Sequence, residues 1–252
     1  MTNNEIKYKK ILPDGSISNF VECFWLIENS NGVEKEIVVI PDGNFDMVLF
    51  KEKDKPFQIG LRGLDTTYML NKISANTKMF FINFKLLAVE YVFHNSIANL
   101  INGGQIFPDN FWDFNENDLN DFEKFTLKAT NTILQIIPKE IDVRKQKLFE
   151  LIYSSNGSMQ VQELSEKVFW SSRQINRYFT QYFGVTLKSY CNILRFRASF
   201  VQIKEGNLFP EQDFADQAHF SKEIKKLSGV NPRELHRNAN DRYIQVSISD
   251  RK

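Results

Sequence analysis

The C-terminal part of the chain alternates apolar and polar positions with the period of an α-helix. In residues 172–183 an apolar side chain recurs every four positions, and the polar and cationic side chains occupy the opposite face. The apolar positions are Ile175, Phe179 and Phe183. Ser171 precedes the segment as a candidate N-cap, and Gly184 follows it as a candidate C-cap. This pattern predicts a short helix that packs through one face and presents hydrogen-bond donors on the other.

Helical periodicity continues on both sides of this segment. Residues 161–168 form another short amphipathic stretch, and only Phe169 and Trp170 separate it from the cap. Two short helices joined by a tight turn have the spacing of a helix-turn-helix motif. Downstream, residues 187–203 predict one continuous helix, roughly 27 Å long at 1.5 Å per residue.

A second segment of the same kind covers residues 217–228, with Asp216 as its N-cap and Gly229 as its stop. Its inner stripe consists of Phe220, Ile224 and Leu227. Two helices that fit a groove, held apart by a rigid helical spacer, can address successive major-groove faces, which recur about every 34 Å along one side of a duplex. For either helix alone, the solvated face of an ordinary helical bundle is the alternative.

About the first 85 residues follow a period of two, which is typical of strands. Strands are predicted over residues 20–27, 36–40, 45–50, 58–64, 68–73 and 78–85. Two turn signatures, Pro13-Asp14-Gly15 and Pro41-Asp42-Gly43, are explained by chain reversal without any binding role. Short strands at this spacing predict a small antiparallel barrel or sandwich.

Helical patterns resume at residues 88–93 and 96–101, and a longer one spans residues 116–137 and ends at Pro138. Its single apolar stripe can pair with a second copy of the chain or cover the barrel, and covering is favoured because such a stripe is usually core. Residues 143–153 predict the first helix of the C-terminal part. The boundary at residues 138–142 therefore divides the chain into an N-terminal domain, 1–139, and a C-terminal domain, 140–252.

The predicted fold class is α+β: an N-terminal antiparallel β-barrel or sandwich, cupin-like, with helices, followed by an all-α domain with two helix-turn-helix motifs joined by a long helix. The 252 residues are 42% hydrophobic, enough for two cores. No 18-residue apolar run and no leader near Met1 is evident, and two distant cysteines, Cys23 and Cys191, suggest a reduced, cytoplasmic, soluble protein with no membrane partner.

Charge is distributed unevenly along the chain. Residues 1–139 hold 14 Lys and Arg against 18 Asp and Glu, whereas residues 140–252 hold 18 against 13. The half that contains the helix pairs is therefore the basic half, as expected of a DNA-binding domain joined to an acidic partner domain.

Catalytic chemistry finds little support in the sequence. The histidines, His94, His219 and His236, are far apart and belong to no metal-binding motif, so no metal or cofactor is expected. No nucleophile elbow or phosphate-binding glycine loop is present, and Gly103-Gly104 is interpreted as a turn. The acidic residues are scattered, and no carboxylate pair can be proposed. The chain is not expected to be an enzyme.

Several short motifs follow one another in the last hundred residues. They are Ser172-Arg173-Gln174-Ile175-Asn176-Arg177-Tyr178-Phe179, Phe183-Gly184-Val185, Tyr190, Arg195, Ala198, Phe214-Ala215-Asp216-Gln217-Ala218-His219-Phe220-Ser221 and Gly229-Val230-Asn231-Pro232. In this order they resemble the AraC/XylS family of transcription regulators. The resemblance implies a seven-helix unit with two helix-turn-helix motifs, joined by the long helix, that binds adjacent major grooves.

The resemblance also assigns roles to residues. Those it places at base edges are Arg173, Asn176 and Arg177 in the first helix and Gln217, Ser221 and Lys222 in the second. Arg pairs with guanine and Asn with adenine. The candidates for neutralising phosphates are Lys188, Lys222, Lys225 and Lys226. The N-terminal half is similar to the sensor part of such regulators through Pro41-Asp42-Gly43, which implies effector sensing or dimerisation with no identified ligand.

Two departures from the family pattern affect the expectations. Residues 206–213 occupy the place of a full supporting helix, and Pro210 leaves room for about one turn, so the second motif is expected to bind DNA more weakly. In the first motif, Phe169 and Trp170 stand where the family often has a small turn residue, and they are expected to cap the local core.

The sequence therefore predicts a regulator that binds promoter DNA, with a small-molecule effector, RNA polymerase and a second copy of the chain as candidate partners. The first alternative is a protein-interaction module on a helix-turn-helix scaffold that has lost DNA binding. The second alternative is an enzyme with its catalyst in the barrel.

Overall fold

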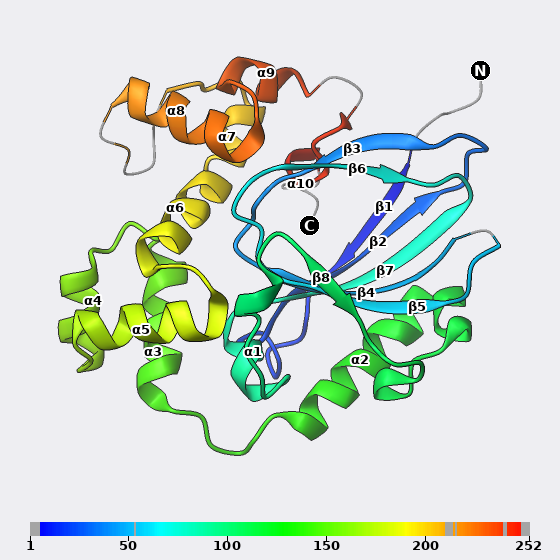
Figure 1. The fold of residues 1–252 in the computed structure, drawn as a ribbon, viewed down its shortest axis with the longest axis horizontal. Helices are drawn as coiled ribbons and strands as arrows, with labels where there is room; N and C mark the ends of the chain where they lie inside the picture. Colours follow the sequence, from blue (N-terminus) through cyan, green and yellow to red (C-terminus); the bar gives the residue numbers. More distant parts are fainter. Residues whose placement is uncertain (1–5, 53, 210–213, 215, 239–240, 248–252) are drawn as a thin grey trace.

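The computed structural model describes residues 6–52, 54–209, 214, 216–238 and 241–247. All strand pairs are antiparallel, in a six-stranded sheet of order β1-β2-β7-β4-β5-β8 and a two-stranded sheet β3-β6 (Figure 1). The strands are β1 (Lys7–Ile11), β2 (Val21–Asn29), β3 (Lys35–Val39), β4 (Phe45–Lys51), β5 (Gln58–Arg62), β6 (Met69–Ile73), β7 (Thr77–Phe84) and β8 (Gly104–Ile106). The fold is α+β, with the antiparallel sheets in the N-terminal half and helices in the C-terminal half, as predicted.

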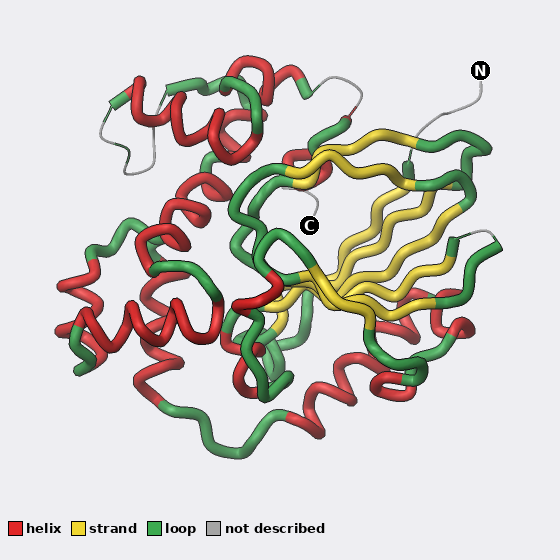
Figure 2. Tube along the Cα trace, viewed as in Figure 1, coloured by secondary structure: helices red, strands yellow, loops and turns green. Residues whose placement is uncertain are grey.

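After β7 the chain is mainly helical, with β8 following α1 and η1, and the helices lie around the sheets (Figure 2). The α-helices are α1 (Leu87–Tyr91), α2 (Phe122–Ile136), α3 (Val143–Ser154), α4 (Val161–Val168), α5 (Ser172–Phe183), α6 (Leu187–Ala198), α7 (Phe200–Lys204), α8 (Gln217–Ser228), α9 (Pro232–Arg237) and α10 (Ile244–Ser247). The 3-10 helices are η1 (Ala98–Leu100), η2 (Phe111–Asp113) and η3 (Glu116–Asn120). None of the helices in the described ranges is long and apolar enough to cross a membrane.

Helix α2 covers the outer face of the six-stranded sheet, on the side opposite β3-β6 (Figure 1). Alternating residues of each strand point to opposite faces, and the set on this face is apolar and includes several phenylalanines. Phe125 of α2 contacts Phe24 and Phe80 of the sheet, with ring centroids 6.3 and 5.3 Å away. The covering role expected for this segment is therefore confirmed. The prediction of one continuous helix from residue 116 is wrong, because the backbone of Asp121 is extended between η3 and α2. The Asp121 side chain caps α2 by accepting from the backbone N–H groups of Glu123 and Lys124.

The predicted helix over residues 187–203 is also interrupted. α6 ends at Ala198 and α7 begins at Phe200, although Ser199 between them keeps right-handed helical backbone angles. The buried Ser199 hydroxyl donates to the carbonyl oxygen of Phe196, 2.6 Å away. A serine that bonds a carbonyl of the preceding turn competes with the helix's own hydrogen bonds and often bends the helix. The spacer thus consists of two helical pieces in sequence.

Strands β1 and β8 were not predicted. β1 is a lysine-rich edge strand, and β8 is only three exposed residues long, so neither has a strong apolar alternation. Gly104, interpreted with Gly103 as a turn, is the first residue of β8 and pairs with Arg62. β1 forms because it pairs with β2, and β8 because it pairs with β5. Such pairing between distant segments cannot be predicted from the local sequence.

The two halves of the chain share their hydrophobic interior. One cluster of buried side chains runs from the sheet through α1 and α2 into α3, α4, α5 and the start of α6. A second joins Val38 and Ile40 to the helices α6 to α9. After α9 the chain returns to the sheet, where the backbone N–H of Val38 donates to the carbonyl oxygen of Arg242 at 2.7 Å. The N-terminal half and the helical half are therefore packed together.

Candidate nucleic-acid interface and ligand cavity

Helix α5 presents a cationic face to solvent. Its start is fixed by a capping box, in which the Ser171 hydroxyl accepts from the N–H of Gln174 and the Gln174 side chain accepts from the N–H of Ser171. Gly184, with φ of +72°, ends the helix in the left-handed conformation. The apolar stripe is buried, whereas Arg173 and Arg177 are exposed and make no ion pair with any residue that the structure describes.

Asn176 occupies a less open position on the same helix. Its side chain is half-buried, and its Nδ2 donates to the carbonyl oxygen of Ser172 at 3.0 Å. The backbone carbonyl of Asn176 in turn accepts from the Thr180 hydroxyl at 2.9 Å. Two hydrogen bonds from Asn176 to a base would require its side chain to give up the bond to Ser172. Arg173 and Arg177 need no such change, because both are exposed.

The turn between α4 and α5 differs from the expectation for its bulky residues. Phe169 is 88% exposed and adopts the left-handed conformation, with φ of +55°. It therefore does not cap the core. Trp170 does pack, because its half-buried ring lies 5.6 Å from the Tyr178 ring and 5.3 Å from the Arg144 guanidinium. The left-handed residue that ends α4 is a phenylalanine where glycine is usual.

Helix α8 begins at Asp216, whose carboxylate accepts from the N–H of His219 at 2.8 Å. Gln217 donates its side-chain amide to the carbonyl oxygen of Leu208 at 2.9 Å, and Ser221 is half-buried. The exposed lysines are Lys188 at the start of α6 and Lys222, Lys225 and Lys226 on α8. Lys226 is 3.7 Å from Glu223. Residues 206–209 are not helical, and Pro210 to Asp213, where a single turn was expected, lie outside the described residues.

The N-terminal half holds the C-terminal end of α5. The N–H of Ile97 donates to the carbonyl oxygen of Tyr182 at 2.9 Å, and the Ser96 hydroxyl donates to that of Gln181 at 2.8 Å. Gly184 approaches η1 so closely that a Cβ built on it would lie 2.7 Å from the carbonyl oxygen of Ala98. The C-terminal end of α5 thus contacts the N-terminal half, while its first turns project away from it (Figure 1).

A cavity of about 800 Å³ lies between the inner face of the six-stranded sheet, the strands β3 and β6, and the helices α6, α7 and α10. The strand register arranges its sheet wall in rows. One row is polar and consists of Cys23, Asn83, Asp46 and Arg62. The next row consists of Trp25, Phe81, Val48 and Gly60. A ligand in this cavity would touch both halves of the chain, because Leu194, Arg197 and Val201 also line it.

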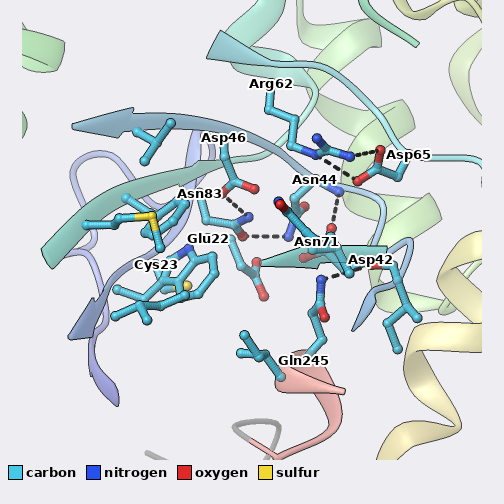
Figure 3. Close-up of a pocket in the computed structure, with 18 of the residues that line it drawn as sticks. Glu22, Cys23, Asp42, Asn44, Asp46, Arg62, Asp65, Asn71, Asn83 and Gln245 are labelled. Carbon is cyan, nitrogen blue, oxygen red and sulfur yellow. Dashed lines mark hydrogen bonds and ion pairs between the residues drawn. The ribbon is translucent and has the colours of Figure 1, made fainter. Parts of the chain in front are cut away.

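Two aspartates and two asparagines form a hydrogen-bonded chain at the polar end of the cavity (Figure 3). Asn83 donates through Nδ2 to Asp46 Oδ1 and accepts through Oδ1 from Asn44 Nδ2, both at 2.8 Å. The N–H of Asn44 donates to Asp42 Oδ1 at 2.9 Å. The carboxylates of Asp42 and Asp46 thus share one site. The acidic residues are therefore not all scattered as expected, because Asp42 of the Pro-Asp-Gly turn and Asp46 line the same cavity.

Burial raises the pKa of both aspartates. For Asp46, burial and the neighbouring Asp42 charge raise the pKa to about 7, against the bonds from Asn83 and Trp25 that lower it. For Asp42, burial raises the pKa although Arg197 and the N–H of Asn44 favour the ionised form. These carboxyl groups are thus costly to ionise while the cavity holds no compensating charge.

The arginines at this end of the cavity are already paired. Arg62 donates through two nitrogens to Asp65, at 2.6 and 3.0 Å. Arg197 of α6 pairs with Glu22, which also lies 3.4 Å from Lys85. Burial alone would raise the pKa of Glu22, but Arg197 and Lys85 hold it below its ordinary value. The Glu22–Arg197 pair joins β2 to α6 in the wall of the cavity.

No metal centre is present in the described ranges, where no three His, Cys, Asp or Glu side chains are grouped to hold an ion. Cys23 lines the cavity as a thiol whose pKa burial raises to about 12. The cavity residues were missed by sequence reasoning. One available signal was Asp46, a carboxylate in strand Phe45–Lys51 whose other residues before Lys51 are all apolar.

Residues 9–104 match the family model described as a domain of unknown function, DUF6597. The chain matches none of the curated proteins with which it was compared. Among solved structures, it is similar to ToxT from Vibrio cholerae. An apo form with a single substitution has 13% identity and a TM-score of 0.46 over 84% of this chain and 96% of that one. A form bound to unsaturated fatty acid has 14% identity and a TM-score of 0.42 over 94% and 97%.

Proposed function

We propose that the chain is a transcription regulator that binds promoter DNA through α5 and α8 and responds to a small molecule held in the cavity. The observation that carries the proposal is the position of Arg173 and Arg177. Both guanidinium groups are exposed on the first half of a capped helix whose opposite face is anchored in the core. A helix held in this way can enter a major groove, where an arginine fork pairs with guanine.

The rest of the helical half supports the same function. Lys222 and Lys225 lie exposed on α8, and Lys188 lies exposed at the start of α6, as phosphate contacts require. The ordered motifs that resemble the AraC/XylS family fall on these helices. In this proposal residues 140–252 bind DNA and residues 1–139 sense the ligand. RNA polymerase and a second copy of the chain remain candidate partners.

The test uses the full chain and a duplex selected by it from random sequence. Arg177→Ala is expected to weaken binding to the selected duplex by about 1 to 3 kcal/mol while changing binding to random duplex little. Arg177→Lys is the matched control, because it keeps the charge but loses the bidentate fork. It should bind random duplex like the parent and still lose preference for the selected one.

Two results would count against this function. Equal losses on both duplexes in Arg177→Ala would reduce Arg177 to a phosphate contact. A chain that binds no duplex in a salt-sensitive manner would favour the alternative, a protein-interaction module on this scaffold.

A further inference from the structure

We infer that the cavity takes a small amphipathic organic cation, an amine or a related N–H donor on an apolar body, with its charged group at Asp46 and Asp42. The inference deepens the proposed function, on which it rests only for the ligand's role in controlling DNA binding. The site itself follows from the wall of the cavity, where two carboxylates without an ion pair among the described residues lie beside a pair of stacked aromatic rings.

The donors at the polar end are used within the protein. Asn83 donates to Asp46, Asn44 donates to Asn83, and the guanidinium of Arg62 is turned to Asp65 (Figure 3). Gln245 of α10, on the other side of the cavity, donates its amide to the carbonyl oxygen of Ile40 at 3.0 Å. Each amide keeps a second N–H and Arg62 keeps Nη1, but a neutral acceptor on these groups makes a weaker bond than a cation makes with an unpaired carboxylate.

The carboxylates of Asp42 and Asp46, in contrast, lack a counter-ion among the described residues. Neither has an ion pair within 4 Å in the part of the chain that the structure describes, since Arg62 and Arg197 are engaged by Asp65 and Glu22. The side-chain oxygens of Asn44 and Gln245 also lack a hydrogen-bond partner among the described residues, but both atoms are fully buried and cannot be reached from the cavity. A cationic N–H donor on the ligand would therefore bind to the two carboxylates.

The neighbouring row of the sheet supplies the surface for an apolar body. The rings of Trp25 and Phe81 are stacked, with centroids 4.0 Å apart, and the Trp25 side chain also hydrogen-bonds Asp46. An aromatic face beside a carboxylate favours a cation over an anion or a neutral group. Beyond these rings the wall is apolar, with Ile27, Ile37, Val39, Met79 and Ile244.

Lysine side chains in the lining could in principle act as counter-ions to Asp42 and Asp46. Lys10 lines the cavity and has no ion pair among the described residues, but it lies on β1, three strands away from Asp46 in the sheet. At the spacing of neighbouring strands this is roughly 14 Å. Lys72, also in the lining, is 2.7 Å from Glu34. Lys85 and Arg197, which also line the cavity, are paired with Glu22, although the charge of Arg197 still favours the ionised form of Asp42. None of these four cations forms an ion pair with either aspartate among the described residues.

The experiment compares three probes of one shape that differ in charge: 4-phenylbutylamine, 4-phenyl-1-butanol and 4-phenylbutyrate. Each is titrated into the full chain at pH 8, without DNA, by isothermal titration calorimetry. The amine is expected to bind at least about tenfold more tightly than the alcohol, and the butyrate more weakly than the alcohol. Asp46→Asn should weaken amine binding by about tenfold and leave the alcohol unchanged, since only the charge is removed.

Asp109→Asn, which removes an exposed carboxylate outside the cavity, is the matched control and should bind all three probes like the parent. Asp42→Asn is the second variant should Asp46→Asn fail to fold, and it should also lose preference for the amine. Equal or tighter binding of the alcohol or the butyrate would overturn the inference, as would unchanged amine binding in both variants or no binding of any probe. Because the titrations contain no DNA, a failure of DNA binding leaves this result intact.

Discussion

The hydroxyl of Tyr190 on α6 donates to the carbonyl oxygen of Gly43, 2.9 Å away, in the turn that carries Asp42. The turn at Gly43 and helix α6 are closely packed against each other. Gly43 has a φ of +82°, and a Cβ built on it would lie 2.7 Å from the Leu194 side chain of the same helix. A ligand that shifts this turn must therefore shift α6, which lies between the two helices proposed to bind DNA.

The first prediction concerns this contact. Tyr190→Phe removes the hydroxyl bonded to Gly43 and, at 3.2 Å, to the Tyr153 hydroxyl, while keeping the buried ring. It should lower the free energy of unfolding by about 1 kcal/mol, as measured by urea denaturation. Tyr182→Phe is the control, because the Tyr182 hydroxyl has no hydrogen bond among the described residues. A loss of the same size in Tyr182→Phe would mean that the Gly43 bond contributes nothing specific.

The second prediction follows from the pKa of Asp46, which rises from 3.8 to about 7 in the folded protein. A folded pKa above the unfolded value means that the folded state holds an extra proton between these values. The stability that this group contributes is therefore complete below about pH 4 and is lost as pH rises towards 7. The groups facing Asp46 are Asp42 in the turn, Cys23 on β2 and Arg62 on β5.

Asp46→Asn removes the cost of ionisation and should raise the melting temperature at pH 8 more than at pH 4.5. The variant keeps an oxygen acceptor for Asn83 and Trp25, so the hydrogen-bonded chain can persist. Asp109→Asn should change the melting temperature equally little at both values. If the gain in Asp46→Asn did not depend on pH, the raised pKa would be refuted.

Local elements of this fold were predictable, and the cavity was not. α5 is specified by its own sequence, because Ser171, Gln174 and Gly184 fix its ends and the apolar stripe fixes its face. The polar end of the cavity depends instead on register: Asp46 meets Asn83, 37 residues later, only because β4 pairs with β7. Glu22 and Arg197 lie 175 residues apart. The periodicity of the sequence does not predict such pairs. A carboxylate such as Asp46 among apolar strand residues does indicate a polar site in the interior.

The third prediction concerns the turn of the first helix pair. The left-handed conformation strains the backbone of a non-glycine residue by roughly 1 to 2 kcal/mol, and glycine avoids this strain. Glycine also loses more conformational entropy on folding, which offsets part of the gain in stability. Phe169→Gly should thus stabilise the protein by about 0.5 to 1 kcal/mol in urea denaturation, because the 88% exposed ring loses little burial. Trp170→Ala, in the same turn, should instead destabilise, since its ring packs on Tyr178. Destabilisation by Phe169→Gly would show that the exposed ring contributes to the fold.

The last prediction separates phosphate contacts from base contacts on α8. Lys225 is exposed and has no ion pair among the described residues, whereas Lys226 lies 3.7 Å from Glu223. A lysine that neutralises one phosphate releases about one counterion, independently of sequence. Lys225→Ala should therefore weaken binding to selected and random duplexes alike and reduce the slope of log affinity against log salt by about one unit. Lys55→Ala is the control, because Lys55 lies in the β4–β5 loop, across the molecule from α8 (Figure 1). A slope that stays at the parent's value in Lys225→Ala would exclude Lys225 as a phosphate contact and leave α5 as the helix that carries DNA binding.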